Sequence, residues 1–397
     1  MTSARRGFAL LVALLVLLCF AGPAAAAGKG PRVEARAWIL IDARTGEVLT
    51  AHAAARRLPI ASTTKLMTAY VVLQELALDR VVRAAPYEPI YGESLLELPA
   101  GERVSVRDLL AGLLMRSGND SAEDLALAAA GSEAAFVAAM NRRAAALGLA
   151  DTHYANPIGL DQRGNYSSAG DLATLTRRLL RIPAFARIVD APTLVLRSLR
   201  PPRRIENSND LLRMEPWVNG VKTGHTFDAG YVLVAAGERK GVELISVALG
   251  TPTEEARYRA NLELLEYGFS QYRRRQPIRA GEDLADPAIR YAGGELPLRA
   301  ARAVTVGLRR GQRLEVQTRA PAEVEGPIRR GAPLGAAMVF LDGRRVAAVP
   351  LRAGRAIPEA SAFDRGRTFI EDNWIIISVA TFVILIGGVL LYRRQFR

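Results

Sequence analysis

A serine and a lysine three residues apart, in Ser62-Thr63-Thr64-Lys65, are the first side chains whose spacing suggests chemistry. On a helix, residues three apart share one face, so the hydroxyl and the amine can come within hydrogen-bonding distance. Serine needs an adjacent base to become a good nucleophile, and a desolvated lysine near other cations can be that base. The helix N-terminus would also offer backbone N–H groups to a developing oxyanion. Alone, the pattern favours a serine that caps a helix above a surface lysine.

Ser117-Gly118-Asn119 is the second group, in a loop expected between helices over 106–115 and 122–130. Side chains two apart on an extended loop point to the same side. Ser117 could then relay a proton, and Asn119 could bind a substrate amide. The alternative is that Asn119 or a neighbour only caps the following helix.

Lys222-Thr223-Gly224-His225-Thr226 is the third group, placed before a strand expected at 231–236. Lys222 would supply a fixed positive charge, and Thr223 would offer a hydroxyl to a carboxylate. Gly224 would let a substrate backbone approach closely. The alternative is an ordinary loop before a strand.

The scarcity of lysine strengthens these assignments. Lysine occurs at four positions, and the other 49 of the 53 basic residues are arginine. Arginine stays protonated, whereas a buried lysine can lose its proton, so a site that needs an amine base cannot use arginine. Two of the four lysines fall in the groups above. The three groups follow the order S-x-x-K, S-x-N, K-T-G of serine acyl-transferases, and their joint chance is less than about one in a thousand.

With these motifs the chain resembles the low-molecular-mass penicillin-binding proteins, the D-alanyl-D-alanine carboxypeptidases, over nearly the whole mature chain. Further segments resemble the same family: 154–160, 165–169, 229–231 and 327–343. The resemblance implies an α/β transpeptidase or β-lactamase-like domain, in which helices flank an antiparallel sheet. It also implies a small all-β domain that acts as a stalk.

The resemblance assigns a role to each candidate residue. Ser62 would be the acylated nucleophile and Lys65 its base. The other assignments are Ser117 and Asn119 lining the cleft, Lys222 and Thr223 holding the substrate, the backbone N–H groups of Ser62 and His225 forming the oxyanion hole, and Arg257 near the substrate carboxylate. Two departures stand out: Asn207-Ser208-Asn209 stands where some members carry an arginine, and the tail looks like a true membrane span rather than an amphipathic helix.

The elements expected around these residues fit a sheet covered by helices over 33–272. Strands are expected at 37–41, 47–49, 231–236 and 243–249, and a helix from Ser62 to about Leu78. After Tyr272, short Val- and Leu-bearing segments separated by Gly, Pro and Arg predict the small all-β domain, at 275–356. Asp342-Gly343 is a hairpin signal within it.

Both ends of the chain carry targeting signals. Two arginines, an apolar run and small residues predict a signal peptide over 1–27. Cys19 also leaves open a lipoprotein, although bulky Phe20 follows it. At the other end a linker over 357–373 leads into 375–392, which has no charge and the length of a transmembrane helix. The arginines after it predict a cytoplasmic tail, with the catalytic domain on the extracytoplasmic side.

Several classes of function are disfavoured. The single cysteine argues against disulfides and a cysteine nucleophile, and no H-E-x-x-H motif suggests a metal. We expect no cofactor and no metal. Secretion argues against nucleic acid despite the net charge of +13, and leaves an anionic membrane or wall polymer, or a merely arginine-rich surface.

The expected partners are peptidoglycan stem peptides ending in D-Ala-D-Ala, β-lactam antibiotics and the cytoplasmic membrane. Two other functions stay open. A class A β-lactamase would need a carboxylate for rapid deacylation, for which Glu206 is a candidate. A non-catalytic cell-wall-binding protein could retain the fold.

Overall fold

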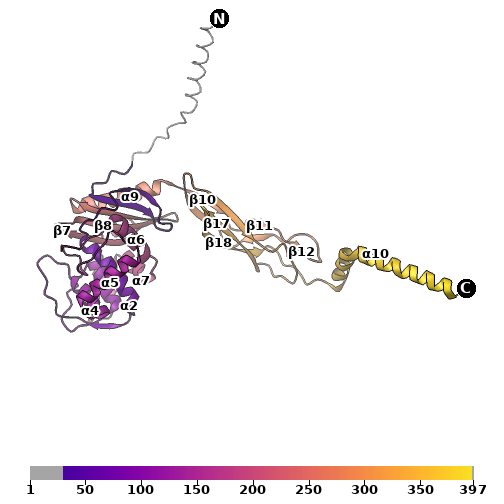
Figure 1. The fold of residues 1–397 in the computed structure, drawn as a ribbon, viewed down its shortest axis with the longest axis horizontal. Helices are drawn as coiled ribbons and strands as arrows, with labels where there is room; N and C mark the ends of the chain where they lie inside the picture. The colour runs from indigo at the N-terminus through magenta and orange to yellow at the C-terminus, as the bar shows by residue number, and fades with distance from the viewer. Residues whose placement is uncertain (1–29, 396–397) are drawn as a thin grey trace, which may run out of the picture. The chain divides into compact units, whose positions relative to one another are not determined.

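The computed structural model describes residues 30–395, with side chains up to residue 389, and forms two compact units (Figure 1). The first unit ends at Ser270, apart from Lys240–Val242, which belong to the second. The second unit continues from Gln271. The expected signal peptide and Cys19 lie outside the described residues.

An antiparallel sheet forms the centre of the first unit, with strand order β2-β1-β9-β8-β7. Its strands are β1 (Ala37–Asp42), β2 (Val48–His52), β7 (Val218–Thr226), β8 (Gly230–Arg239) and β9 (Val242–Thr251). All six residues of β1 are buried, which explains why this strand reads as an apolar run rather than an alternating one. Two hairpins, β3 (Val81–Arg83) with β4 (Arg103–Ser105) and β5 (Thr193–Leu196) with β6 (Arg203–Glu206), lie apart from the sheet.

Helices cover both faces of this sheet, with α9 on one side and the group around α2, α4 and α5 on the other (Figure 1). The helices are η1 (Ala61–Thr64), α2 (Lys65–Glu75), α3 (Val106–Ala111), η2 (Gly112–Arg116), α4 (Asn119–Ala130), α5 (Glu133–Ala146), α6 (Ala169–Leu179), α7 (Pro183–Asp190), α8 (Leu211–Met214) and α9 (Glu254–Ser270). Serine side chains cap three of them: Ser105, Ser132 and Ser168 each accept a backbone N–H from three residues on. The predicted α/β fold with an antiparallel sheet and flanking helices is confirmed.

Two elements differ from the sequence-based expectation. The helix expected from Ser62 begins as the short 3-10 turn η1 and ends at Glu75. The Lys222 motif lies within strand β7 rather than in a loop before a strand. Polar residues are buried along β7, so neither an apolar run nor a polar–apolar alternation marks it as a strand.

The second unit contains the small all-β domain that the sequence predicts. Its main sheet has the order β11-β13-β18-β17-β15, and two further strand pairs are β10–β14 and β12–β16. The strands are β10 (Tyr272–Ile278), β11 (Asp283–Ala285), β12 (Ala288–Ile289), β13 (Leu298–Ala300), β14 (Val304–Arg309), β15 (Leu314–Arg319), β16 (Glu323–Val324), β17 (Pro333–Leu341) and β18 (Arg344–Ala353). Asp342 and Gly343 both have positive φ in the β17–β18 hairpin, as its type I′ turn requires.

A long helix, α10 (Ala362–Gln395), ends the described chain. The linker expected over 357–373 is therefore helical from Ala362. Residues 362–389 are long and apolar enough to cross a membrane, and none of the apolar window is buried against the rest of the protein. At about 1.5 Å per residue, this stretch exceeds a hydrocarbon core of about 30 Å.

Candidate active site

Ser62 lies in η1, a turn that is held by hydrogen bonds to the preceding residues. The backbone N–H and the hydroxyl of Thr63 both donate to the Ile60 carbonyl, at 3.1 and 2.6 Å. Ala61 has a positive φ of 45°, a conformation that costs energy for a residue with a side chain. The conformation of this turn determines where the Ser62 side chain is placed.

Two glycines let neighbouring segments reach the backbone of this turn. A Cβ on Gly159 would lie 2.1 Å from the Ala61 carbonyl oxygen, and one on Gly224 would lie 2.9 Å from the Ser62 nitrogen. Strand β7 and the loop at Gly159 therefore hold the turn on two sides. The close approach that Gly224 permits here is that of the protein's own serine, whereas the sequence suggested the backbone of a substrate.

Lys65 is fully buried, and its amine has three partners. Lys65 Nζ lies 3.0 Å from Ser62 Oγ, 2.6 Å from Asn119 Oδ1 and 2.6 Å from the Ile158 carbonyl oxygen. No carboxylate among the described residues forms an ion pair with it. Burial, followed by the charge of Lys222, holds the pKa of Lys65 well below its ordinary value. A lowered pKa increases the fraction of neutral amine, which is the form that can accept the serine proton.

Ser117 and Asn119 come from the junction between two helices. The π-helical turn η2 ends at Ser117, which adopts the left-handed conformation (φ 61°), and α4 begins at Asn119. Both side chains are buried. The Asn119 backbone N–H donates to the Ser94 carbonyl at 2.8 Å, and its side-chain oxygen accepts from Lys65. The expected loop is thus reduced to two residues at a strained turn.

Lys222 and Thr223 lie on β7 with both side chains buried. Lys222 Nζ donates to the Thr223 carbonyl at 2.8 Å. Burial and the nearby charge of Arg257 lower the pKa of Lys222 to about 7. The fixed positive charge expected from the sequence is therefore only partly present at neutral pH, and a bound carboxylate would restore it by favouring the protonated amine.

Arg257 belongs to α9 and is 5% exposed. Its Nη2 donates to Tyr258 Oη at 2.8 Å and pairs with Glu254. Its Nε is buried and has no hydrogen-bond partner among the described residues. A buried guanidinium with an unused N–H donor can bind an oxyanion by donating a hydrogen bond to it. The fold thus brings Arg257, 35 residues along the chain from Lys222, into electrostatic range of that lysine.

His225 follows on the same strand, and its ring is exposed. It lies against Tyr231 of β8, with 4.1 Å between the ring centroids. The structure thus brings Ser62, Lys65 and Asn119 into direct contact, joins Lys222 to Arg257 electrostatically, and leaves the His225 side chain at the surface. The role predicted for His225, in the oxyanion hole, requires only its backbone N–H.

Three contacts were not foreseen from the sequence. The Ile158 carbonyl accepts from Lys65, Ser208 Oγ lies 3.3 Å from Thr223 Oγ1, and Tyr258 Oη lies 3.4 Å from the Ser208 carbonyl. The two contacts of Ser208 link Thr223 of β7 to Tyr258 of α9. Ile158 lies in the segment 154–160 that resembles the family, and Ser208 lies where some members carry an arginine, but no spacing rule marks either residue.

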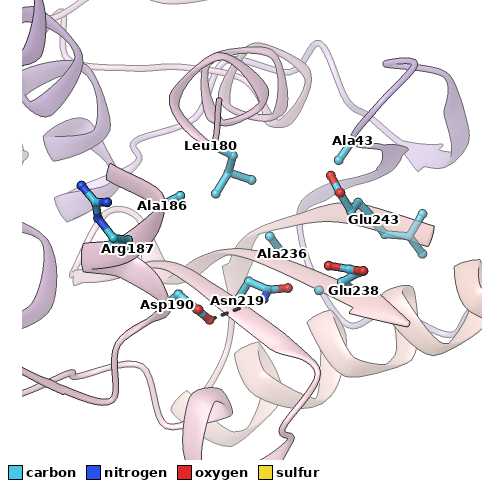
Figure 2. A pocket seen from close by; sticks show the side chains of 11 residues that line it. Ala43, Leu180, Ala186, Arg187, Asp190, Asn219, Ala236, Glu238 and Glu243 are labelled. Atoms are coloured by element: carbon cyan, nitrogen blue, oxygen red, sulfur yellow. Dashed lines mark hydrogen bonds between the residues drawn. The ribbon is translucent and has the colours of Figure 1, made fainter. Parts of the chain in front are cut away.

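Two cavities on the protein are lined by residues outside this candidate site. Figure 2 shows a cavity of about 260 Å³ lined by carboxylates and small apolar side chains, where Asn219 donates to Asp190 at 3.4 Å. None of the nine candidate residues lines it. Glu206 lies exposed on β6 and lines a different cavity with Arg116 and Arg203. Among residues 30–389, no three His, Cys, Asp or Glu side chains gather in a way that could hold a metal.

Comparison with known proteins agrees with this architecture. The family model described as D-alanyl-D-alanine carboxypeptidase matches residues 24–253. The chain is 33% identical to D-alanyl-D-alanine carboxypeptidase DacC of Escherichia coli K12 over 93% of this chain and 96% of the relative. It is 29% identical to D-alanyl-D-alanine carboxypeptidase DacF of Bacillus subtilis 168, over 87% of this chain and 93% of that relative. The solved structure of penicillin binding protein 6B from Escherichia coli matches with a TM-score of 0.60 and 29% identity, over 82% of this chain and 98% of that one.

The fold is that of the penicillin-binding class of proteins, to which the matched structure of penicillin binding protein 6B belongs. Because the family model matches more than half of the chain, and a relative above 30% identity is covered almost completely, the chain belongs to the D-alanyl-D-alanine carboxypeptidase family.

Proposed function

We propose that this protein is a serine carboxypeptidase that removes the terminal D-alanine from peptidoglycan stem peptides ending in D-Ala-D-Ala. The observation that carries the proposal is the buried amine of Lys65, 3.0 Å from Ser62 Oγ, with a pKa far below its ordinary value. A lysine with a lowered pKa, within hydrogen-bonding distance of a serine hydroxyl, can activate that serine as a nucleophile.

In the proposed reaction Ser62 Oγ attacks the carbonyl carbon of the penultimate D-alanine while Lys65 takes the hydroxyl proton. The oxyanion accepts hydrogen bonds from the backbone N–H groups of Ser62 and His225. The C–N bond then breaks, the leaving amine receives a proton, and D-alanine departs. Water hydrolyses the Ser62 ester and frees the shortened peptide. A β-lactam would acylate the same oxygen.

Recognition of the terminal carboxylate is assigned to the cationic side of the site. Lys222, Thr223 and Arg257 would share this group, and Ser117 and Asn119 would line the opposite wall. The lowered pKa of Lys222 and the unused Nε of Arg257 support this assignment. A bound anion would stabilise the protonated form of Lys222 and would accept a hydrogen bond from the Arg257 Nε–H.

The remaining segments receive roles from their sequence. We propose that residues 1–27 direct secretion, 33–272 catalyse the reaction, 275–356 form a stalk, 357–373 link the stalk to the membrane, and 375–392 cross the cytoplasmic membrane. The catalytic domain would then work on the extracytoplasmic side. The length and apolar surface of α10 support the anchor.

One experiment separates the proposed enzyme from its alternatives. The purified protein is incubated with a peptide ending in D-Ala-D-Ala and, separately, with labelled penicillin. Released D-alanine and a long-lived adduct, both lost in Ser62→Ala, are expected. Rapid penicillin turnover without D-alanine release would indicate a β-lactamase, and no reaction with either would leave only a binding protein.

A further inference from the structure

The positive charge of this protein is concentrated in the β domain, residues 271–356. This segment holds 17 arginines and eight carboxylates. Residues 30–270, by contrast, hold 28 lysines and arginines and 28 carboxylates, so the catalytic unit is neutral. A bias toward arginine spread over the whole genome would make both parts basic. The uneven distribution therefore indicates a feature of the β domain itself.

Within the β domain, eight of the 17 arginines but two of the eight carboxylates lie at one end. Tyr272 of β10 pairs with Arg309, and Leu314 of β15 pairs with Leu341. The start of β10, the turn after β14 and the tip of the β17–β18 hairpin therefore lie at the same end, which we call the entry end because the chain enters the domain there. Its arginines are Arg273, Arg274, Arg275, Arg309, Arg310, Arg313, Arg344 and Arg345, against the carboxylates Glu315 and Asp342.

Most of these arginines form no ion pair with the residues that the structure describes. Five are exposed and have no carboxylate within ion-pair distance among the described residues: Arg273, Arg274, Arg275, Arg310 and Arg345. Three of the five are consecutive on β10, so their side chains alternate between the two faces of that strand. Like charges at this density repel one another when nothing compensates them. An external anion would remove that cost.

We propose that the entry end of the β domain binds a linear polyanion of the cell envelope that carries phosphate or carboxylate groups at regular intervals. The guanidinium fork binds both groups through two parallel hydrogen bonds. Side chains two residues apart on a strand share one face and are about 6.6 Å apart, so Arg273 and Arg275 can meet two anionic groups of one polymer. The inference rests on the proposed extracytoplasmic location, and it does not depend on the catalytic reaction.

An anionic bilayer fits this end less well than a polymer. The chain leaves the domain at Ile357, which bridges to Ile328, and α10 begins five residues later. The membrane anchor is thus attached to the opposite, exit end. The nine residues of β17 separate the two ends by about 30 Å, about four times the distance over which physiological salt screens a charge.

The test uses the full-length protein in neutral nanodiscs of phosphatidylcholine, with polyphosphate and polyglutamate as two separate probes. The variant is Arg273→Gln/Arg274→Gln/Arg275→Gln. The matched control, Arg319→Gln/Arg329→Gln/Arg330→Gln, removes the same charge from exposed arginines toward the exit end. The entry-end variant should lose about tenfold or more in affinity and show a weaker salt dependence, while the control loses less than about twofold. The probe that binds more tightly identifies the anionic group.

Two outcomes would overturn the proposal. Equal weakening in both triple variants would mean that only total charge matters. Loss of polyphosphate binding when phosphatidylglycerol is added to the nanodiscs would mean that the arginines dock on lipid. Release of D-alanine from a short peptide should be unchanged in both variants, which separates this test from the test of the enzyme and reports on folding.

Discussion

Replacing Asn119 by aspartate would test whether Lys65 acts as a neutral base. Asn119 Oδ1 lies 2.6 Å from Lys65 Nζ, so the substitution places a negative charge beside the amine with almost no change in shape. At an effective dielectric constant of about 20, unit charges at this distance attract by about 6 kcal/mol. Burial of the new carboxylate offsets part of this. If about 3 kcal/mol remains in favour of the protonated amine, the neutral fraction of Lys65 falls about 100-fold.

The assay is the rate at which fluorescent penicillin acylates Ser62, measured between about pH 6 and pH 10. The rate should rise with pH as Lys65 loses its proton. Asn119→Asp raises the pKa of Lys65, so the rise moves to higher pH. Asn119→Ala removes the amide without adding charge, and should slow the reaction without that displacement. Identical pH dependence in the two variants would refute the role of Lys65 as the neutral base.

Two further predictions concern the glycine beside the nucleophile and the lysine of β7. Gly159→Ala and Gly164→Ala impose the same backbone strain, at φ 91° and 92°, but a Cβ on Gly164 meets nothing closer than 3.7 Å. In urea unfolding Gly164→Ala should cost about 1–2 kcal/mol, and Gly159→Ala at least about 2 kcal/mol more, with slower acylation. Equal costs would show that packing against Ala61 is unimportant.

Lys222, with a pKa of about 7 in the folded protein, should take up a proton when a peptide carboxylate binds at about pH 8, as calorimetry in buffers of different ionisation enthalpy would detect. Lys222→Arg should bind without this uptake. Because the unfolded chain holds this proton up to a higher pH, stability should also rise from about pH 7 toward pH 10, and less so in Lys222→Met. A proton balance that is unchanged by Lys222→Arg would argue against this assignment.

Local patterns predicted much of this fold. The buried run of β1, the strands β8 and β9, and the β17–β18 hairpin follow from apolar runs and turn residues that act over a few positions. Strand β7 was missed because the polar residues of the site occupy its buried positions. The polar residues that the site requires therefore remove the apolar pattern by which the strand could be recognised in the sequence.

The candidate residues were recognised as a set, by order and by lysine scarcity, but their contacts were not. The Ile158 carbonyl and Lys65 are 93 residues apart, and Ser208 and Thr223 come from different segments. No periodicity encodes such pairs, because tertiary packing alone decides them. The lowered pKa of Lys222 has the same origin, since burial and the position of Arg257 are properties of the folded chain.

The three partners of the Lys65 amine also determine where its lone pair points. Asn119 Oδ1 and the Ile158 carbonyl oxygen have no hydrogen to give, so each can only accept from the amine. A neutral amine has two N–H groups and one lone pair, and these two oxygens occupy both N–H groups. The lone pair is then directed to the remaining neighbour, the Ser62 hydroxyl, which is the only one of the three that can donate. Loss of one proton from Lys65 thus orients the base toward its serine without any movement of the side chain.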